Sequence, residues 1–308
     1  MSGKSKLALD TPSQPRCRRR VTVLGLLVRL ALAVAAGALA FNLIAYAAAA
    51  ADRRRRPAAC GADEDEPAAW AAGVRAFAFE CVATTVLAWI APLAFRRRRV
   101  RPFDARLQHP PVVLLHGYLQ HSANFLWLAR RLRRDGWVHL YAVGHVPLGG
   151  DIERSGVRLA GVIDRIRRET GADDVDIVAH SMGGLVARAC MCAGAAGIRR
   201  IITLGTPHQG TEVFRRLGVD PMLRQMRPGS PCLHRLAGAN AMPARTELIS
   251  IYSRDDALVV PPSNAYCPGA FNIEVRGPGH MSLLFSRRVY ELVRENLAAE
   301  AEPARRIS

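Results

Sequence analysis

The stretch Val175-Asp-Ile-Val-Ala-His-Ser-Met-Gly-Gly-Leu185 decides how the rest of this 308-residue sequence is interpreted. Its first four residues are mostly apolar and β-branched, which predicts a buried strand. The run breaks at 179–184, and the residues from Leu185 to Cys190 follow a helical pattern. We therefore expect a strand that turns sharply into a helix, with Ser181 at the apex of the turn.

A serine at such an apex is held in a strained backbone conformation that exposes its hydroxyl, an arrangement called a nucleophile elbow. The residues two before and two after it must be small, and here they are Ala179 and Gly183. Glycine is usual at the first of these positions. The A-x-S-x-G pattern taken alone therefore fits an ordinary Gly-rich strand-to-helix turn equally well. Residues elsewhere in the chain must distinguish this turn from a nucleophile elbow.

Composition and charge narrow the class of protein. Half of the residues are hydrophobic and 22% are charged, which is ample for a core and unlike a disordered chain. The net charge of +17 is uneven, because residues 1–106 hold 18 Lys and Arg against 8 Asp and Glu. These basic blocks flank apolar runs, as expected at a membrane surface. No helix-turn-helix, zinc or RNA-recognition pattern is present, so we expect no nucleic-acid partner.

A basic flank at 1–20 precedes a predicted membrane-anchor region at 21–106, which ends in a basic linker. Its apolar segments predict helices at 25–51 and 68–95, and the first contains 22 consecutive uncharged residues, Leu30–Ala51. Roughly 20 residues suffice to cross a bilayer. The second carries Arg75 and Glu80, which are costly in lipid unless they are paired. We expect a transmembrane two-helix hairpin in a bacterial inner membrane; the alternative is that the second helix lies on the membrane surface or on the domain that follows it in the chain.

A cleaved signal peptide is the alternative for the first apolar segment, and it would make the protein secreted. Ala45-Tyr-Ala47 resembles a small-residue cleavage site. The uncleaved helix is favoured, because the apolar run exceeds the roughly 7–15 residues of a signal core. The distribution of Lys and Arg weakly favours both ends of the hairpin on the cytoplasmic side.

The remaining chain, a domain at 107–300 with a tail at 301–308, alternates predicted strands and helices. Helical spacing predicts helices over 125–134, 152–169 and 281–297. Apolar runs predict strands over 112–115, 138–143, 175–178, 201–204, 247–252 and 271–275. This alternation predicts an α/β fold with a mostly parallel sheet flanked by helices.

Candidate partners for the elbow serine follow two late strands. Asp256 comes just after the strand at 247–252, and the adjacent Asp255 is the alternative acid. His280 lies in a glycine-containing loop before the closing helix. Serine, acid and histidine in this chain order are typical of one group of hydrolases. We expect Ser181 as nucleophile, His280 as general base and Asp256 as the acid that orients it.

The expected oxyanion hole consists of the backbone N–H groups of Tyr118, in the loop after the first strand, and Met182, directly after the nucleophile. We expect His180 to pack beneath the elbow, and His116 and His208 to support the same sheet edge. This chemistry requires no metal or organic cofactor. A structural Ca²⁺ is an alternative left open.

The seven cysteines form no C-x-x-C pair. Buried free thiols are therefore the favoured interpretation. A disulfide between Cys232 and Cys267 is the alternative.

Together these motifs resemble the bacterial lipases of the α/β-hydrolase superfamily, above all the small Bacillus-type (class 2) lipases with an A-H-S-M-G elbow. The resemblance implies the α/β-hydrolase fold and hydrolysis of carboxylic esters of acyl glycerols, with Ser181, Asp256 and His280 as catalytic triad. A phospholipase, thioesterase or acyltransferase would use the same residues, and a non-catalytic lipid- or partner-binding homologue is a further alternative. The matching stretches are Pro111–Gly117, Val175–Gly184, Ser250–Ser253 with Asp256, and Gly277–Leu284.

The chain departs from those minimal lipases in its N-terminal apolar segments and in an insertion at 212–246. The insertion resembles the lid-bearing region of larger bacterial lipases, and its apolar residues would cover an acyl-binding cleft. The alternative is a packed helical excursion without gating. The residues concerned are Phe214, Leu217, Met222, Leu223, Met226 and Leu233.

Overall fold

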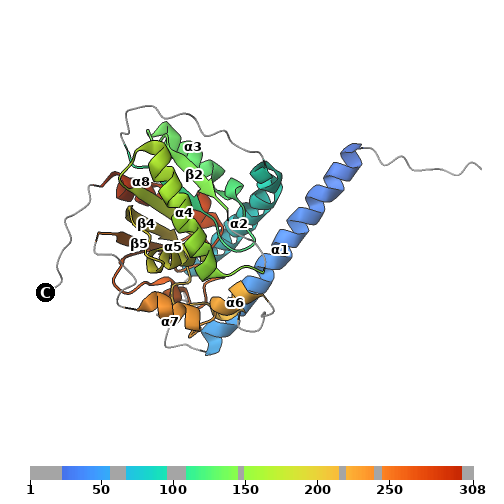
Figure 1. The fold of residues 1–308 in the computed structure, drawn as a ribbon. Coiled ribbons are helices and arrows are strands. Elements are labelled where there is room, and N and C mark those ends of the chain that lie inside the picture. Colours follow the sequence, from blue (N-terminus) through green and yellow to red (C-terminus); the bar gives the residue numbers. More distant parts are fainter. Residues whose placement is uncertain are drawn as a thin grey trace, which may run out of the picture.

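The structure is a computed structural model that describes residues 23–55, 67–95, 109–144, 149–214, 220–238 and 245–299. The predicted basic flank at 1–20, basic linker at 96–106 and tail at 301–308 lie outside the described residues. Within them, a sheet domain (residues 109–299) is joined by two long N-terminal helices (Figure 1).

Six strands form one sheet in the order β2-β1-β3-β4-β5-β6. They are β1 (Val112–Leu115), β2 (Leu140–Val143), β3 (Val175–His180), β4 (Ile198–Leu204), β5 (Glu247–Ser253) and β6 (Phe271–Val275). Every neighbouring pair is parallel. The carboxyl ends of all six strands therefore meet at one edge, and the predicted α/β class with a parallel sheet is confirmed.

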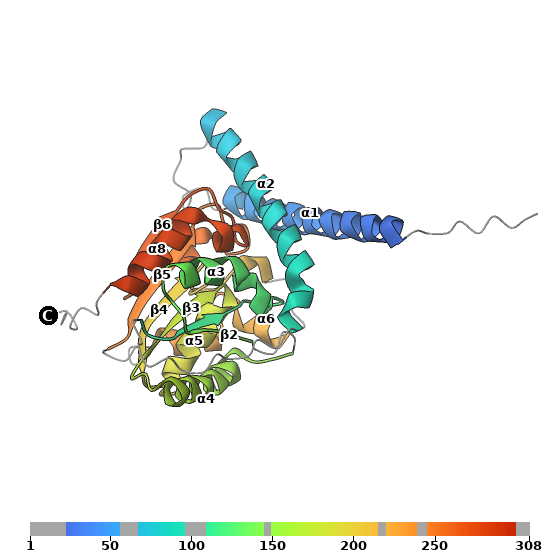
Figure 2. The same ribbon diagram turned by 90° about the horizontal axis from the view of Figure 1, so that it is seen from above.

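Helices cover both faces of the sheet (Figure 2). One face carries α3 (Leu126–Arg134) and α8 (Arg287–Ala298), and the other carries α4 (Ile152–Thr170) and α5 (Met182–Cys192). Alternate residues of a strand point to opposite faces. Accordingly, Val112 and Leu114 join the core beneath α3 and α8, whereas Val113 and Leu115 join the core beneath α4 and α5.

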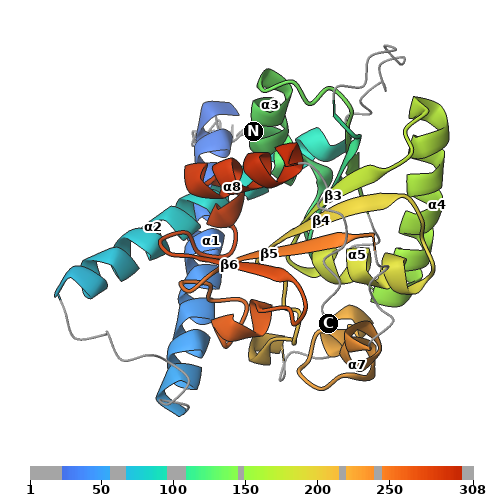
Figure 3. The same ribbon diagram turned by 90° about the vertical axis from the view of Figure 1, so that its left-hand side faces the viewer.

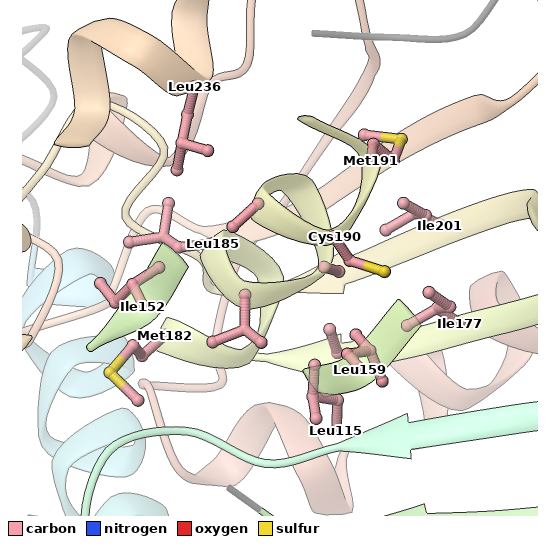
Figure 4. Close-up of a cluster of buried hydrophobic side chains, with 14 of the residues drawn as sticks. Leu115, Ile152, Leu159, Ile177, Met182, Leu185, Cys190, Met191, Ile201 and Leu236 are labelled. Carbon is pink, nitrogen blue, oxygen red and sulfur yellow. The ribbon is translucent and has the colours of Figure 1, made fainter. Parts of the chain in front are cut away.

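The core on the α4–α5 side is closely packed (Figure 4). Side chains from the sheet, such as Leu115 and Ile177, meet Leu159 of α4 and Leu185 of α5. The two helices approach closely at Gly156, where a Cβ atom would lie 2.6 Å from the backbone of α5. Only a residue without a side chain can occupy that contact.

Short 3₁₀ helices and loops fill the connections at the sheet edge. They are η2 (Ala91–Phe95), η3 (Ser122–Phe125), η4 (Glu212–Phe214), η5 (Pro262–Ala265) and η6 (Ser282–Phe285). The predicted closing helix over 281–297 is wrong at its start, because α8 begins only at Arg287. The Ser286 side chain accepts the backbone N–H of Val289 at 3.3 Å and caps the new helix.

Two short helices, α6 (Pro221–Gln225) and α7 (Pro231–Ala237), occupy the predicted insertion. Met222, Met226 and Leu233 are buried in the core on the α4–α5 side, and Figure 4 places Leu236 of α7 above Leu185. The structure therefore favours the packed alternative for this part of the insertion. Leu217 and the side chain of Phe214 lie outside the described residues.

The N-terminal helices α1 (Val23–Arg55) and α2 (Pro67–Ile90), here called the N-terminal hairpin, pack against each other and cross obliquely (Figure 3). Each buries one stripe at helical spacing, and the rest of its apolar surface is exposed. The segments Gly25–Asp52 and Ala71–Leu93 are long and apolar enough to cross a membrane, judged by length and composition. The buried stripes are Ala38, Asn42, Ala45 and Ala49 on α1, and Ala76, Glu80, Ala83 and Leu87 on α2.

All five described cysteines are free thiols. Cys232 and Cys267 are both buried and are not linked, so the alternative disulfide is absent. Cys190 is buried as expected, whereas Cys192 is exposed.

The α4–α5 contact generates a stability prediction. In Gly156→Ala the new methyl group would overlap the α5 backbone, and overpacking of this kind typically costs about 1–3 kcal/mol. Gly161 lies on the same helix with open space around it, so Gly161→Ala should leave stability unchanged or raise it by about 0.5–1 kcal/mol. Thermal unfolding of the two variants in detergent measures the difference. Equal midpoints would contradict the packing described.

Candidate active site

Ser181 occupies the turn between β3 and α5, as the sequence predicts. Its backbone dihedrals are φ 56° and ψ −131°, and it is one of two described non-glycine residues with positive φ. Such a conformation is strained for a side chain with a Cβ atom. This turn places the serine hydroxyl at the carboxyl edge of the sheet. The geometry is that of a nucleophile elbow.

The residues around Ser181 are small because other backbone segments pass close to them. A Cβ atom at Gly183 would lie 2.5 Å from the carbonyl oxygen of Leu115 at the end of β1. A Cβ atom at Gly117 would lie 2.7 Å from the Cβ atom of Ser181 itself. Ala179 is fully buried. The elbow and the loop after β1 therefore touch, and neither tolerates larger residues at these points.

The structure brings the three predicted triad residues together. The Oγ atom of Ser181 lies 2.9 Å from Nε2 of His280, and Nδ1 of His280 lies 2.7 Å from Oδ2 of Asp256. His280 comes from the loop between β6 and α8, and Asp256 from the loop after β5. His280 and Asp256 are both buried, so water competes little for their hydrogen bond.

The two neighbouring aspartates have different partners. The second oxygen of Asp256 accepts backbone N–H groups from Leu258 at 2.8 Å and Val259 at 2.9 Å, which fixes the carboxylate. Asp255 instead accepts the N–H of Gly277 at 2.6 Å, so it ties two loops together. Of the two acids that the sequence left open, Asp256 is the one at His280.

The surroundings shift the pKa values of the two central histidines in opposite directions. Burial is the largest single influence and lowers the pKa of His280. The charge and the hydrogen bond of Asp256, together with the charge of Glu80, act in the opposite direction, and the net pKa is raised from 6.5. Burial, followed by the charge of His280, lowers the pKa of His180 to about 3. His280 is thus suited to take up a proton, whereas His180 stays neutral.

The other predicted histidines surround the triad without joining it. The ring nitrogens of His180 lie 2.9 Å from the carbonyl oxygen of His280 and 2.9 Å from Oε1 of Gln120, so the ring packs beneath the elbow as expected. His116 contacts the carbonyl of its neighbour. His208 lies 3.0 Å from the hydroxyl of Thr203.

The two predicted oxyanion donors lie on either side of Ser181. Met182 is the first residue of α5, where backbone N–H groups have no partner within the helix. Tyr118 follows Gly117, whose backbone passes against Ser181. In the described part of the chain, no residue accepts a hydrogen bond from either N–H group. Both are therefore available to a substrate oxygen.

Comparison with known proteins agrees with this geometry. A model of the PGAP1-like alpha/beta domain matches residues 158–219, which include the elbow. Triacylglycerol lipases of Pseudarthrobacter phenanthrenivorans and Burkholderia plantarii are each 33% identical over 57 residues. That alignment covers 18% of this chain and 18% and 16% of the two relatives, so the chain matches less than a fifth of their length.

Solved structures extend the likeness to about two thirds of the chain. Lipase B of Aspergillus fumigatus superposes with a TM-score of 0.58 at 17% identity, over 68% of this chain and 57% of that one. The mature lipase BlEst2 of Bacillus licheniformis gives 0.56 at 18% identity, over 66% of this chain and 96% of that one. The fold is that of an α/β-hydrolase. At these identities the likeness concerns the fold alone, and the assignment to the Bacillus-type subgroup stays a prediction.

Two polar residues next to the candidate triad were not predicted from the sequence. Gln120 accepts the N–H of Gly117 at 2.9 Å and contacts His180, so it braces the loop after β1. Glu80 of α2 accepts N–H groups beside His280. A single carboxylate in an apolar helix indicates that the carboxylate has a hydrogen-bond partner, but the sequence does not identify that partner.

Across the described ranges, no three His, Cys, Asp or Glu side chains come together in a way that could hold a metal ion.

The different partners of the two aspartates lead to a test of the site. Asp256→Asn should lower the rate at which a fluorophosphonate labels Ser181 by about 10³-fold or more, because His280 loses the acceptor that fixes its tautomer. Asp255→Asn keeps an oxygen for Gly277 and should label at nearly the wild-type rate. Labelling is followed in the full-length protein by in-gel fluorescence. Equal rates in the two variants would contradict the assignment of Asp256.

Proposed function

We propose that this protein is a serine hydrolase that cleaves carboxylic esters, a lipase or esterase acting on acyl glycerols. The observation that carries the proposal is the continuous chain of contacts from Ser181 through His280 to Asp256. In the described residues no other serine stands at a strained elbow with a histidine at hydrogen-bond distance.

In the first half of the proposed reaction, Oγ of Ser181 attacks the acyl carbonyl carbon and its proton passes to Nε2 of His280. Asp256 holds Nδ1 of the ring and stabilises the imidazolium that forms. The tetrahedral intermediate collapses, the alcohol leaves with the proton from His280, and the acyl group stays on Ser181 as an ester.

In the second half, water replaces the alcohol. His280 takes a proton from water, the hydroxide attacks the acyl-enzyme, and the carboxylic acid leaves as the proton returns to Ser181. In both halves the negative oxygen faces the N–H groups of Tyr118 and Met182. Losing one such donor typically costs about 3–4 kcal/mol of transition-state stabilisation.

The acyl glycerol substrate is proposed from the relatives and from the surface. The two curated relatives, each aligned over 57 residues, are named triacylglycerol lipases. Beside the oxyanion donors, the side chain of Leu119 is 60% exposed, an apolar contact of the kind an acyl chain would use. A large apolar surface on the outer faces of α1 and α2 adjoins the domain.

The hairpin of α1 and α2 is the proposed membrane attachment, with its exposed apolar side chains in lipid. Its inner stripes contact the hydrolase domain, so the domain would lie against the bilayer rather than at the end of a tether. In this arrangement the second helix meets the catalytic domain, which the sequence left as an alternative to a free transmembrane helix. An ester substrate dissolved in the membrane would then be close to Ser181.

The proposed activity predicts the behaviour of one serine. Ser181→Ala in the full-length protein should lower turnover of p-nitrophenyl esters by at least about 10⁴-fold, because the nucleophile is gone. Ser263 is exposed, and no hydrogen bond of its hydroxyl is found among the described residues, so Ser263→Ala is the matched control and should keep wild-type turnover. Undiminished turnover by Ser181→Ala would refute the proposal. Fluorophosphonate labelling of Ser181 without ester turnover would point instead to a phospholipid, thioester or acyl-transfer substrate.

The proposed anchor predicts an intact N-terminus. Asn42 donates to Thr84 of α2 at 3.1 Å, and Ala45 packs against the hydrolase domain. Both residues precede the suspected cleavage site after Ala47 and would be lost with a signal peptide. The intact mass of protein extracted from bacterial membranes should therefore include them. A mature chain that starts at Ala48 would overturn the anchor.

A further inference from the structure

Glu80 lies in the middle of α2, within an apolar helix, and is 2% exposed. Its two carboxyl oxygens accept two backbone N–H groups of the hydrolase domain, that of Met281 at 2.6 Å and that of Ser282 at 2.9 Å. These are the two residues directly after His280. A buried carboxyl group is costly unless it is hydrogen-bonded, and here both of its oxygens have donors.

The same turn is shaped to receive this carboxyl group. A Cβ atom at Gly279 would lie 2.6 Å from Oε2 of Glu80, so glycine on the other side of His280 leaves room for it. The N–H of Gly279 is accepted by the hydroxyl of Ser282 at 2.7 Å. Because α8 begins only at Arg287, the N–H groups of this turn have no helical partners of their own. Glu80 supplies the acceptors that they need.

The hairpin also touches the other two loops of the site. The carbonyl oxygen of Leu87, two turns after Glu80, lies 3.2 Å from Nε2 of His121 in the loop that carries Tyr118. On α1, Ala45 and Ala49 pack against residues that follow Asp256, namely Ala257, Leu258 and Val260. The oxyanion, acid and histidine loops thus all contact the two N-terminal helices.

We propose that Glu80 is a positioning residue for His280, and that the N-terminal hairpin is thereby a working part of the active site as well as its attachment. This inference rests on the proposed serine-hydrolase function. By holding the N–H groups of Met281 and Ser282, Glu80 fixes the backbone of the histidine loop. The imidazole then stays within reach of both Ser181 and Asp256.

The test compares Glu80→Gln with wild type in the full-length protein in detergent micelles. Glutamine has the same shape, but its amide offers one acceptor and turns an N–H₂ group toward the second N–H of the loop. The matched control is Thr85→Val on the same helix, because the hydroxyl of Thr85 bonds only to its own helix, at the carbonyl of Cys81.

Two readouts are measured on each variant. In Glu80→Gln, backbone hydrogen exchange of the peptide that contains Met281 and Ser282 should become about tenfold faster, while the amides of β3 and β4 stay protected. The kcat for a p-nitrophenyl ester should fall by about 10-fold to 100-fold with KM nearly unchanged, since the base is displaced rather than the substrate site. Thr85→Val should match wild type in both.

The outcomes separate this inference from the proposed function. Unchanged exchange in Glu80→Gln would overturn the positioning role whatever the enzyme hydrolyses. Faster exchange with an unchanged kcat would overturn it as well, since the loop would then move without consequence. If wild type itself turns over no ester, the proposed function fails, and the rate of fluorophosphonate labelling of Ser181 takes the place of kcat. Loss of protection throughout β3 and β4 would show that Glu80 supports the whole fold and would also refute a local role.

Discussion

The backbone of Ser181 has to stay at a positive φ, and much of the surrounding packing serves that constraint. Such a conformation costs of the order of 1–3 kcal/mol and persists only where its surroundings leave no alternative. Here the N–H of Ser181 donates to Leu204 in β4, and its carbonyl accepts the hydroxyl of Thr206. Gly183 lies against the end of β1. Contacts with β1 and β4 therefore hold the Ser181 backbone in place, and its hydroxyl lies at hydrogen-bond distance from His280.

Given that fixed serine, the parallel sheet determines where its partners can stand. All strands end at one edge, so the loops after β1, β5 and β6 reach Ser181 from three sides. Each loop is then held by a contact of its own: Gln120 for the first, Asp255 for the second and Glu80 for the third. These three residues lie outside the Ser181–His280–Asp256 triad, and Glu80 belongs to a helix some 200 positions earlier in the chain than the N–H groups that it accepts.

The sheet class, the elbow and the order of serine, acid and histidine could be predicted from the sequence, because each depends on residues that are close together in the chain. Apolar runs predict strands, and small residues at 179 and 183 predict a tight turn. Contacts between distant segments leave no such pattern. The sequence favours Asp256 over Asp255, but it does not show which loop each carboxylate contacts. It also does not show that α8 begins at Arg287, after the Ser286 cap. For the same reason the sequence left open whether Met222, Met226 and Leu233 belong to a lid or to a packed excursion, and the structure shows them buried.

The proposed reaction requires a covalent acyl intermediate on Ser181. The most direct measurement is a rapid acid quench of the full-length protein with a long-chain p-nitrophenyl ester, followed by peptide mass spectrometry. We expect a burst of p-nitrophenol close to one per active chain, and the acyl group on the peptide that contains Ser181. Ester turnover with the acyl group on another residue, or with no acyl group on Ser181 at any quench time, would contradict the account.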